Sequence, residues 1–201
     1  MATHPIRLVG DPVLRQRAAE VTEIDDKLVR LADEMLTTMY EAPGVGLAAP
    51  QIGVRKRLFV YDIGEGPQVV INPTISETDG EWVYDEGCLS VPGLSWEIVR
   101  PKQVHLTGVD LDGNELSVEA DELVARCFQH ELDHLDGVLL LERLDADTRK
   151  VALKAIRERG IGAEVAGPAG LVGGGGGAGG GGGLPGLGGG GRRTLGQPPK
   201  P

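Results

Sequence analysis

Residues 129–137 read Gln-His-Glu-Leu-Asp-His-Leu-Asp-Gly and place His130 and His134 four positions apart, with Glu131 directly after the first histidine. Side chains at positions i and i+4 of an α-helix lie on one face, about a turn apart. Two imidazoles placed in this way reach one cation, while the adjacent carboxylate is free to act on a third bound species. This stretch therefore predicts a metal-binding helix that carries a general base and ends at Gly137.

The residues before this stretch support the helix. Leu123 and Cys127 continue the helical spacing of the histidines, and Asp121 offers a cap. However, H-E-x-x-H has only three defined positions and also occurs by chance. The alternative is a helix whose histidines and acid bind no metal, so other parts of the chain must distinguish the two.

Composition divides the chain into two parts. The 201 residues carry a formal net charge of −10, and glycine dominates from residue 160 onward. A glycine-rich segment buries little apolar surface and loses much backbone entropy on ordering. We therefore expect one catalytic domain over residues 1–160 and a Gly-rich disordered tail over 161–201. The tail has a net charge of +2, which leaves −12 for the domain.

Charge and hydropathy exclude several classes of function. An acidic domain is a poor ligand for the phosphates of DNA. No stretch reaches membrane-spanning length, and the first residues lack a basic-then-apolar secretion signal. We expect a cytoplasmic protein that binds neither DNA nor membranes. In that reducing compartment Cys88 and Cys127 are expected to be thiols, either a metal ligand or a buried group.

The order of the elements predicts an α+β fold. Apolar side chains at helical spacing predict a helix over 26–41, and another over 145–159 packed by Val151, Leu153 and Ile156. Strands are predicted over residues 56–63, 69–75, 94–100, 103–110 and 115–119. Because the strands precede the metal helix, we expect antiparallel or mixed sheets packed around it, with N-terminal and C-terminal helices.

Two details of this prediction depend on single features. Pro73 lacks a backbone N–H, so it is expected to lie on an edge strand or near the end of its strand. Residues 138–141 form a short apolar run that suggests a last strand.

A catalytic zinc-type site takes three protein ligands and leaves one position open. One class of metalloproteases has its third histidine where this chain has Leu140, and Glu158, a second alternative, lies among basic residues that suggest a solvated face. Cys127 is about 10 Å along the helix axis from His134, so one metal hardly reaches both with His130. Cys88, on a separate glycine-flanked bend, can approach from the opposite side.

The run Gly44-Val-Gly-Leu-Ala-Ala-Pro-Gln51 is small and apolar with one polar side chain. Its glycines allow close approach to another segment or to a ligand. Two interpretations stay open from composition: a tight loop under the core, or a binding site in which Gln51 donates to a developing oxyanion.

Three stretches together resemble the motifs of the peptide deformylase family: Gly44 to Gln51, Glu86-Gly-Cys-Leu-Ser90 and Gln129-His-Glu-Leu-Asp-His134. The resemblance covers about residues 4–158. It implies a metal-dependent hydrolase that removes the formyl group from the N-terminal formylmethionine of newly synthesised polypeptides and releases formate. The alternative is a non-catalytic deformylase-like protein that binds peptide or metal, which would be expected to lack one of the reactive residues.

The resemblance also implies residue roles. One divalent metal, Fe²⁺ in the family and replaceable by Ni²⁺, Co²⁺ or Zn²⁺, would be bound by Cys88, His130 and His134. Glu131 would be the general acid/base, and Gln51 with the backbone N–H of Leu89 would form the oxyanion hole.

The substrate peptide would lie extended against the backbone at Val45 and Gly87, with Gly46 among the substrate-binding residues. The residues implied near the methionine side chain are Val45, Tyr84, Leu123, Arg126 and Cys127. Arg126 is the polar member of this set, and we expect it to pair with Glu86 rather than to extend its head into solvent. The expected partners are formyl-Met nascent chains, near the ribosome exit, and the expected state is a monomer.

Overall fold

The computed structural model describes residues 2–162 and 193–194. Nearly all of the predicted tail over 161–201 lies outside the described residues, so its disorder stays a prediction. The fold is α+β, as the order of elements predicted, and the described residues form three α-helices and antiparallel sheets. The helices are α1 (Asp26–Glu41), α2 (Glu122–Asp136) and α3 (Ala146–Glu158), and the 3-10 turns are η1 (Pro12–Arg15), η2 (Ala49–Ile52) and η3 (Leu140–Arg143).

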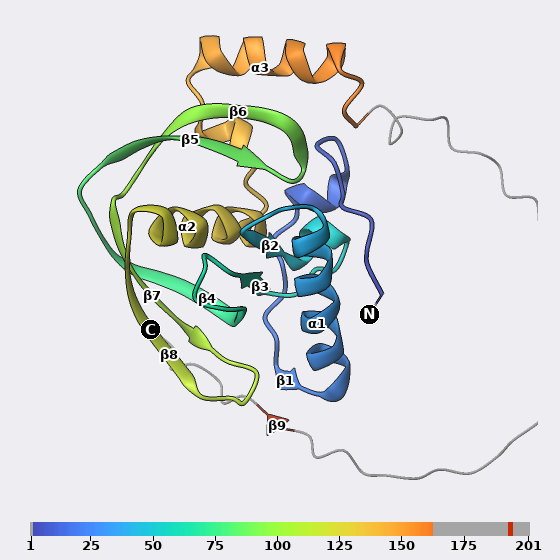
Figure 1. The fold of residues 1–201 in the computed structure, drawn as a ribbon, viewed down its shortest axis with the longest axis vertical. Helices are drawn as coiled ribbons and strands as arrows, with labels where there is room; N and C mark the ends of the chain where they lie inside the picture. The colour runs from blue at the N-terminus through green and yellow to red at the C-terminus, as the bar shows by residue number, and fades with distance from the viewer. Residues whose placement is uncertain (1, 163–192, 195–201) are drawn as a thin grey trace, which may run out of the picture.

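The largest sheet is antiparallel, with strand order β2-β3-β4-β7-β8. Its strands are β2 (Gly46–Ala48), β3 (Leu58–Tyr61), β4 (Gln68–Asp79), β7 (Gln103–Val109) and β8 (Glu115–Asp121). A separate hairpin pairs β5 (Trp82–Cys88) with β6 (Val91–Arg100), and β1 (Glu23–Ile24) pairs with β9 (Arg193–Thr194). The hairpin lies across α2 from the large sheet (Figure 1).

Helix α2 is central because two faces of it are covered. Ala125, Phe128 and Leu135 pack into the core of the large sheet, next to Phe59 and Leu106. The opposite face carries polar side chains that meet β5 and β6. The helix ends at Gly137, as predicted, where φ is +75° and an added Cβ would lie 2.7 Å from the backbone of Arg15.

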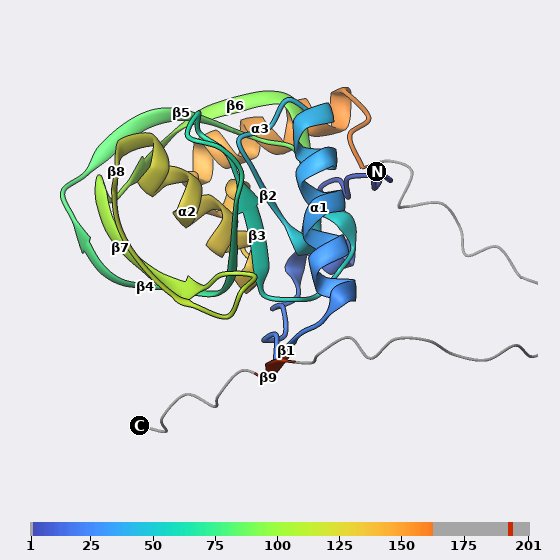
Figure 2. The ribbon, with the colours of Figure 1, turned by 60° about the horizontal axis from the view of Figure 1, so that its bottom comes forward.

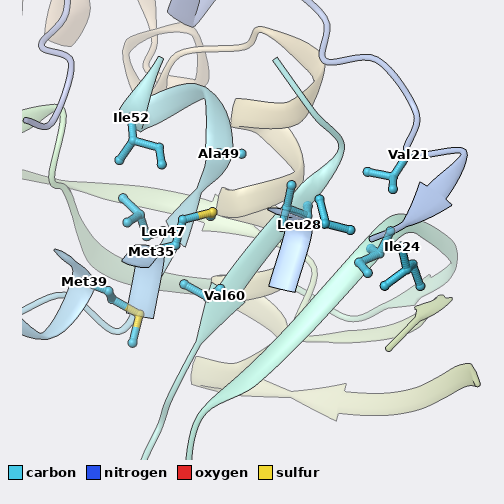
Figure 3. Packing of buried hydrophobic residues seen from close by; sticks show 11 residues of the cluster. Val21, Ile24, Leu28, Met35, Met39, Leu47, Ala49, Ile52 and Val60 are labelled. Atoms are coloured by element: carbon cyan, nitrogen blue, oxygen red, sulfur yellow. The ribbon is translucent and has the colours of Figure 1, made fainter. Parts of the chain in front are cut away.

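Helix α1 packs on the side of the large sheet opposite to α2, through the row of apolar side chains that the helical spacing predicted. Asp25 caps it by accepting from the Leu28 N–H at 2.9 Å. Leu28, Met35 and Met39 are buried against side chains of β2 and β3 (Figure 3). Figure 2 shows α1 beside β2 and β3, with α2 on their other side.

The prediction for Pro73 is correct only in part: the strand does not end near it, but the pairing of β4 with β3 stops at Ile71, so beyond Pro73 β4 is paired with β7 alone, as at a sheet edge. Strand β4 lies between β3 and β7, and Pro73 stands in its middle. The β4–β7 register shifts between Ile71 and Thr74, and Asn72 has a φ of +50°. A bulge leaves a residue outside the hydrogen-bond ladder, so a proline without an N–H is tolerated there.

Near the C-terminal end of the domain, the predicted last strand is wrong, and the predicted packing of the last helix is correct only for Ile156. Residues 138–141 form no strand: the 3-10 turn η3 begins at Leu140 and buries it with Leu141. On α3 (Ala146–Glu158), Val151 and Leu153 are 66% and 40% exposed, and the buried positions are Ala152 and Ile156. Because α3 meets the hairpin along one narrow face, an i, i+4 pair suffices to pack it.

Among the described helices, none has both the length and the apolar character needed to cross a bilayer.

Candidate metal centre

The structure brings together one sulfur and two imidazoles from two elements. Helix α2 presents His130 and His134, and the end of β5 presents Cys88. Their ligand atoms lie within 4.8 Å of one another, and Cys88 Sγ is 3.2 Å from His134 Nε2. The rejected alternative, Glu158, lies exposed on α3, where it pairs with Lys154 at 3.7 Å.

Cys88 is held by a tight hairpin turn. It is the last residue of β5 and pairs with Val91, so the turn consists of Leu89 and Ser90. The Ser90 N–H donates to Cys88 Sγ at 3.4 Å, and the Val9 N–H of the N-terminal arm donates to the Ser90 carbonyl at 2.9 Å. The sequence predicted a bend at this point but not the strand β5 that leads into it.

The charges of the three groups suit a metal. Burial raises the pKa of the Cys88 thiol, but the neighbouring His134 and His130 lower it well below its usual value. Burial lowers the pKa of His130, whereas the Cys88 sulfur and Glu86 raise it well above its ordinary value. Thiolate and imidazole are ligands of Zn²⁺ and of first-row transition metals, so the donor set fits a divalent ion.

The sequence identified Glu86 only as a partner of Arg126, and its contact with the candidate ligand His130 was not predicted. Its Oε1 lies 2.7 Å from His130 Nδ1, and Arg100 and Arg126 also bind the carboxylate. Burial raises the pKa of Glu86, but Arg100 and His130 lower this pKa by more than burial raises it, so the net shift is downward. The ionised carboxylate orients the His130 ring and leaves Nε2 available to bind a metal. The predicted Arg126–Glu86 pair is confirmed, at 2.7 Å.

Glu131 is buried beside the candidate ligands. Burial raises its pKa to about 7, against the lowering effect of His130 and His134. Its Oε2 has no hydrogen-bond partner within the described part of the chain. A Cβ added to Gly46 would lie 2.4 Å from Glu131 Oε1 and 2.9 Å from Cys127 Sγ, so only glycine leaves the carboxylate this space.

Gln51 is 1% exposed, and its amide is fixed at both ends. Its Oε1 accepts from the Ala48 N–H at 2.8 Å, which directs Nε2 toward Ser90 Oγ at 3.2 Å and Cys88 Sγ at 3.7 Å. The amide therefore presents its N–H groups beside the candidate metal ligands. Of the two interpretations of this loop, the structure favours the wall of a binding site.

A cavity of about 730 Å³, called the site cavity below, opens over these groups. Apolar side chains with large exposed fractions stand around it: Val45 at 48%, Tyr84 at 47% and Leu123 at 39%. Its lining includes every predicted site residue except His134, namely Val45, Gly46, Gln51, Tyr84, Gly87, Cys88, Leu89, Leu123, Arg126, Cys127, His130 and Glu131. Cys127 is a free, buried thiol, as predicted.

Comparison with known proteins gives one consistent result. A family model described as polypeptide deformylase matches residues 3–150. The chain is 52% identical to a peptide deformylase from Agathobacter rectalis, over 79% of this chain and all of that protein, and 50% identical to one from Acidothermus cellulolyticus, over 79% and 88%.

Solved structures agree in fold. A peptide deformylase from Legionella pneumophila superposes with a TM-score of 0.76 at 38% identity, covering 83% of this chain and 100% of that one. One from Ehrlichia chaffeensis in complex with actinonin also gives 0.76, at 37% identity and with 79% and 98% covered.

Proposed function

Because the chain belongs to the peptide deformylase family, we propose that the site cavity is where its reaction occurs and that Glu131 and Gln51 carry it out. The chain is a metal-dependent hydrolase that removes the formyl group from the N-terminal formylmethionine of newly synthesised polypeptides and releases formate. The observation that supports the proposed roles is the convergence of Cys88, His130 and His134 beside a buried carboxylate and a fixed amide.

Cys88, His130 and His134 would hold the metal, for which we propose Fe²⁺, with Ni²⁺, Co²⁺ or Zn²⁺ as replacements. When bound, such an ion acts as a Lewis acid and lowers the pKa of water to near 7. The protein's contribution is to keep the sulfur ionised and the His130 ring oriented, through the charges of the histidines and the carboxylate of Glu86.

Glu131 is the proposed general acid/base. A carboxyl with a pKa of about 7 takes and returns a proton at neutral pH with little cost. Its unpartnered Oε2 would accept a proton from the attacking water and then donate it to the leaving amine, which becomes the free N-terminus.

Gln51 and the backbone N–H of Leu89 are the proposed donors to the formyl oxygen as negative charge develops on it. The Gln51 Nε2 is held in place before substrate arrives, because Oε1 is already occupied by the Ala48 N–H. Because the negative charge on this oxygen is larger in the transition state than in the substrate, such donors stabilise the transition state more, and their fixed position avoids a reorganisation cost.

The peptide is proposed to run between β2 and β5. Strand β2 is the end strand of its sheet and β5 pairs with β6, so the described strands leave an edge of each available for an extended chain. Val45, Gly46 and Gly87 line the cavity at these edges. The methionine side chain would enter among the apolar groups of Tyr84, Leu123 and Cys127.

The substrate also suggests where the protein acts. A formylated N-terminus is found on chains that have just been made, so we propose a cytoplasmic monomer that meets them near the ribosome exit.

The test is formate release from a formyl-Met-Ala-Ser peptide by full-length protein purified without oxygen and reconstituted separately with Fe²⁺, Ni²⁺, Co²⁺ and Zn²⁺. We expect release that depends on the metal and ranks the ions. Bound metal without release would instead support the non-catalytic peptide-binding alternative.

A further inference from the structure

We propose that Arg126 is a positioning residue that connects the wall of the substrate cavity to the metal ligand His130 through one shared carboxylate, that of Glu86. This inference rests on the proposed function, because it assumes that the site cavity receives the substrate. It assigns Arg126 a role in orientation rather than in chemistry.

The guanidinium of Arg126 is held on its polar edge by two acceptors. It is 3% exposed, its Nη1 donates to Glu86 Oε2 at 2.7 Å, and its Nη2 donates to the carbonyl of Trp82 at 2.7 Å. Both acceptors belong to β5, whereas Arg126 belongs to α2. A planar cation with two fixed bonds has little freedom to rotate.

The face of the same guanidinium supports an aromatic pair. Arg126 Cζ lies 4.9 Å from the ring centre of Trp82 and 5.7 Å from that of Tyr84. The two rings stack with centres 4.6 Å apart and planes 24° apart. Trp82, Tyr84 and Glu86 alternate along β5, so they share the strand face that meets α2. Tyr84 lines the site cavity, and its ring is therefore backed by a rigid cation.

Glu86 connects Arg126 to the candidate metal ligand His130, because its carboxylate contacts both side chains. Its Oε2 accepts from Arg126 while its Oε1 faces His130 Nδ1 at 2.7 Å. Arg126 and His130 are one turn apart on α2, so one carboxylate spans an i, i+4 pair. Partners of this kind behind a ligand set its ring orientation, and their loss typically costs about 10- to 100-fold in metal affinity or activity.

Because Arg100 also binds Glu86, the loss of Arg126 should not leave this buried carboxylate without a charged partner. The Nε and Nη2 of Arg100 bind the two oxygens of Glu86 at 2.8 and 2.7 Å. The carboxylate therefore keeps a charged partner when Arg126 is replaced, and we expect the domain to fold. What is lost is the support of Tyr84 and one of the bonds that orient Glu86.

A purely structural role for Arg126 would lower stability alone, and Arg57 provides the matched control. Arg57 is 7% exposed and donates to the Asp136 carboxylate at 2.6 Å and the Pro73 carbonyl at 3.2 Å, so it repeats the carboxylate-plus-carbonyl pattern of Arg126. It does not line the site cavity. Arg57→Met thus removes a comparable buried cation without touching the proposed connection.

The experiment compares wild type, Arg126→Met, Arg126→Lys and Arg57→Met as full chains. The three measurements are the urea unfolding midpoint, kcat and KM for formyl-Met-Ala-Ser, and the visible spectrum and dissociation constant of the Co²⁺ form. For Arg126→Met we expect KM to rise about tenfold, cobalt to bind about tenfold more weakly and the cobalt absorption to shift. Arg57→Met should lower the midpoint and leave KM and the spectrum at wild-type values.

Arg126→Lys separates charge from geometry. A lysine ammonium cannot hold the two acceptors and support the rings together, so this variant should regain stability while KM and the spectrum stay altered. The inference is wrong if Arg126→Lys has the KM and the cobalt spectrum of wild type, or if Arg126→Met changes only the unfolding midpoint. An inactive wild-type protein would contradict the proposed function instead, so the two failures are distinguishable.

Discussion

Two cavities in the described part of the molecule are similar in size but very different in chemistry. The site cavity has a volume of about 730 Å³. The second, called the acidic cavity below, has a volume of about 780 Å³ and lies between the β3–β4 turn and strands β4, β7 and β8. The acidic cavity includes five carboxylates, all on exposed residues: Glu65, Glu77, Asp79, Glu119 and Asp121.

The difference lies in burial and convergence rather than in volume. In the site cavity the polar groups are withdrawn from water and aimed at one another, which shifts the pKa of Cys88 and Glu131 in opposite directions. Exposed carboxylates keep their hydration and repel each other only weakly. Reactivity is therefore expected where buried groups converge, and the following experiments test that contrast.

The largest expected effect is that of Glu131→Ala. Removal of the buried carboxylate takes away the proposed proton carrier and leaves the three candidate ligands, so metal content should stay at one equivalent. We expect kcat to fall by about 1000- to 10,000-fold, at the upper end of what acid/base catalysis contributes. Formate release and metal analysis check this, and turnover within tenfold of wild type would refute the assigned role.

Gln51→Ala should come next. Loss of one preorganised donor typically costs about 100- to 1000-fold in kcat. The same substitution removes the acceptor of the Ala48 N–H, so the unfolding midpoint must be measured alongside the kinetics. A fall in stability with kcat unchanged would assign Gln51 to the core rather than to the reaction.

Gly46→Ala tests the space around Glu131. The added methyl would come within 2.4 Å of Oε1, so the carboxylate must move. A displacement of about 1 Å can cost about 100-fold in rate. Metal affinity should change little, because the atoms nearest to the added methyl belong to Glu131 and Cys127, and neither residue is a candidate ligand. Wild-type kcat in a folded Gly46→Ala protein would contradict the need for glycine.

Glu142 lies outside both cavities and shows how much a partly exposed carboxylate contributes to the free energy of unfolding. Burial raises its pKa, but hydrogen bonds from Arg15 and the Leu139 N–H outweigh that and lower it. Since the folded pKa is below the unfolded one, the stabilisation is present above about pH 4.5 and is lost as pH falls through the folded value. Glu142→Gln should lower the free energy of unfolding by less than about 1 kcal/mol at pH 7.

Urea unfolding of wild type and Glu142→Gln at pH 7 and at pH 3 measures this. The difference between the two proteins should shrink at the lower pH. A difference that grows on acidification would mean that the carboxylate is not the stabilising form.

The smallest effect is expected in the acidic cavity. The double variant Glu77→Gln, Glu119→Gln removes two exposed charges across β4 and β8 and should leave kcat/KM within about twofold of wild type. The same assay used for Glu131→Ala measures it. A tenfold change would show that this cavity contributes to the reaction and would remove the contrast drawn above.

Local patterns in the sequence were sufficient for the elements whose signal is contained in one segment. The stripe of α1, the histidine spacing of α2 and the αL stop at Gly137 each depend on neighbours within a turn. Patterns failed where another segment decides the outcome. Pro73 lies inside a long strand because a bulge accommodates it and the pairing with β3 has already stopped at Ile71, and Val151 is exposed because α3 meets little else.

For the site, the sequence by itself determined the residue types: a histidine pair on one helix face, an adjacent acid and a cysteine flanked by glycine on another segment. It also determined the family, because three motifs occur in one order. Only the tertiary structure decided how Glu86 is used. Its distances to His130, Arg100 and Arg126 join β5, β6 and α2, and no spacing along one element encodes a contact among three. Burial by the whole domain also raises the pKa of Glu131 to about 7, which a list of residues does not contain.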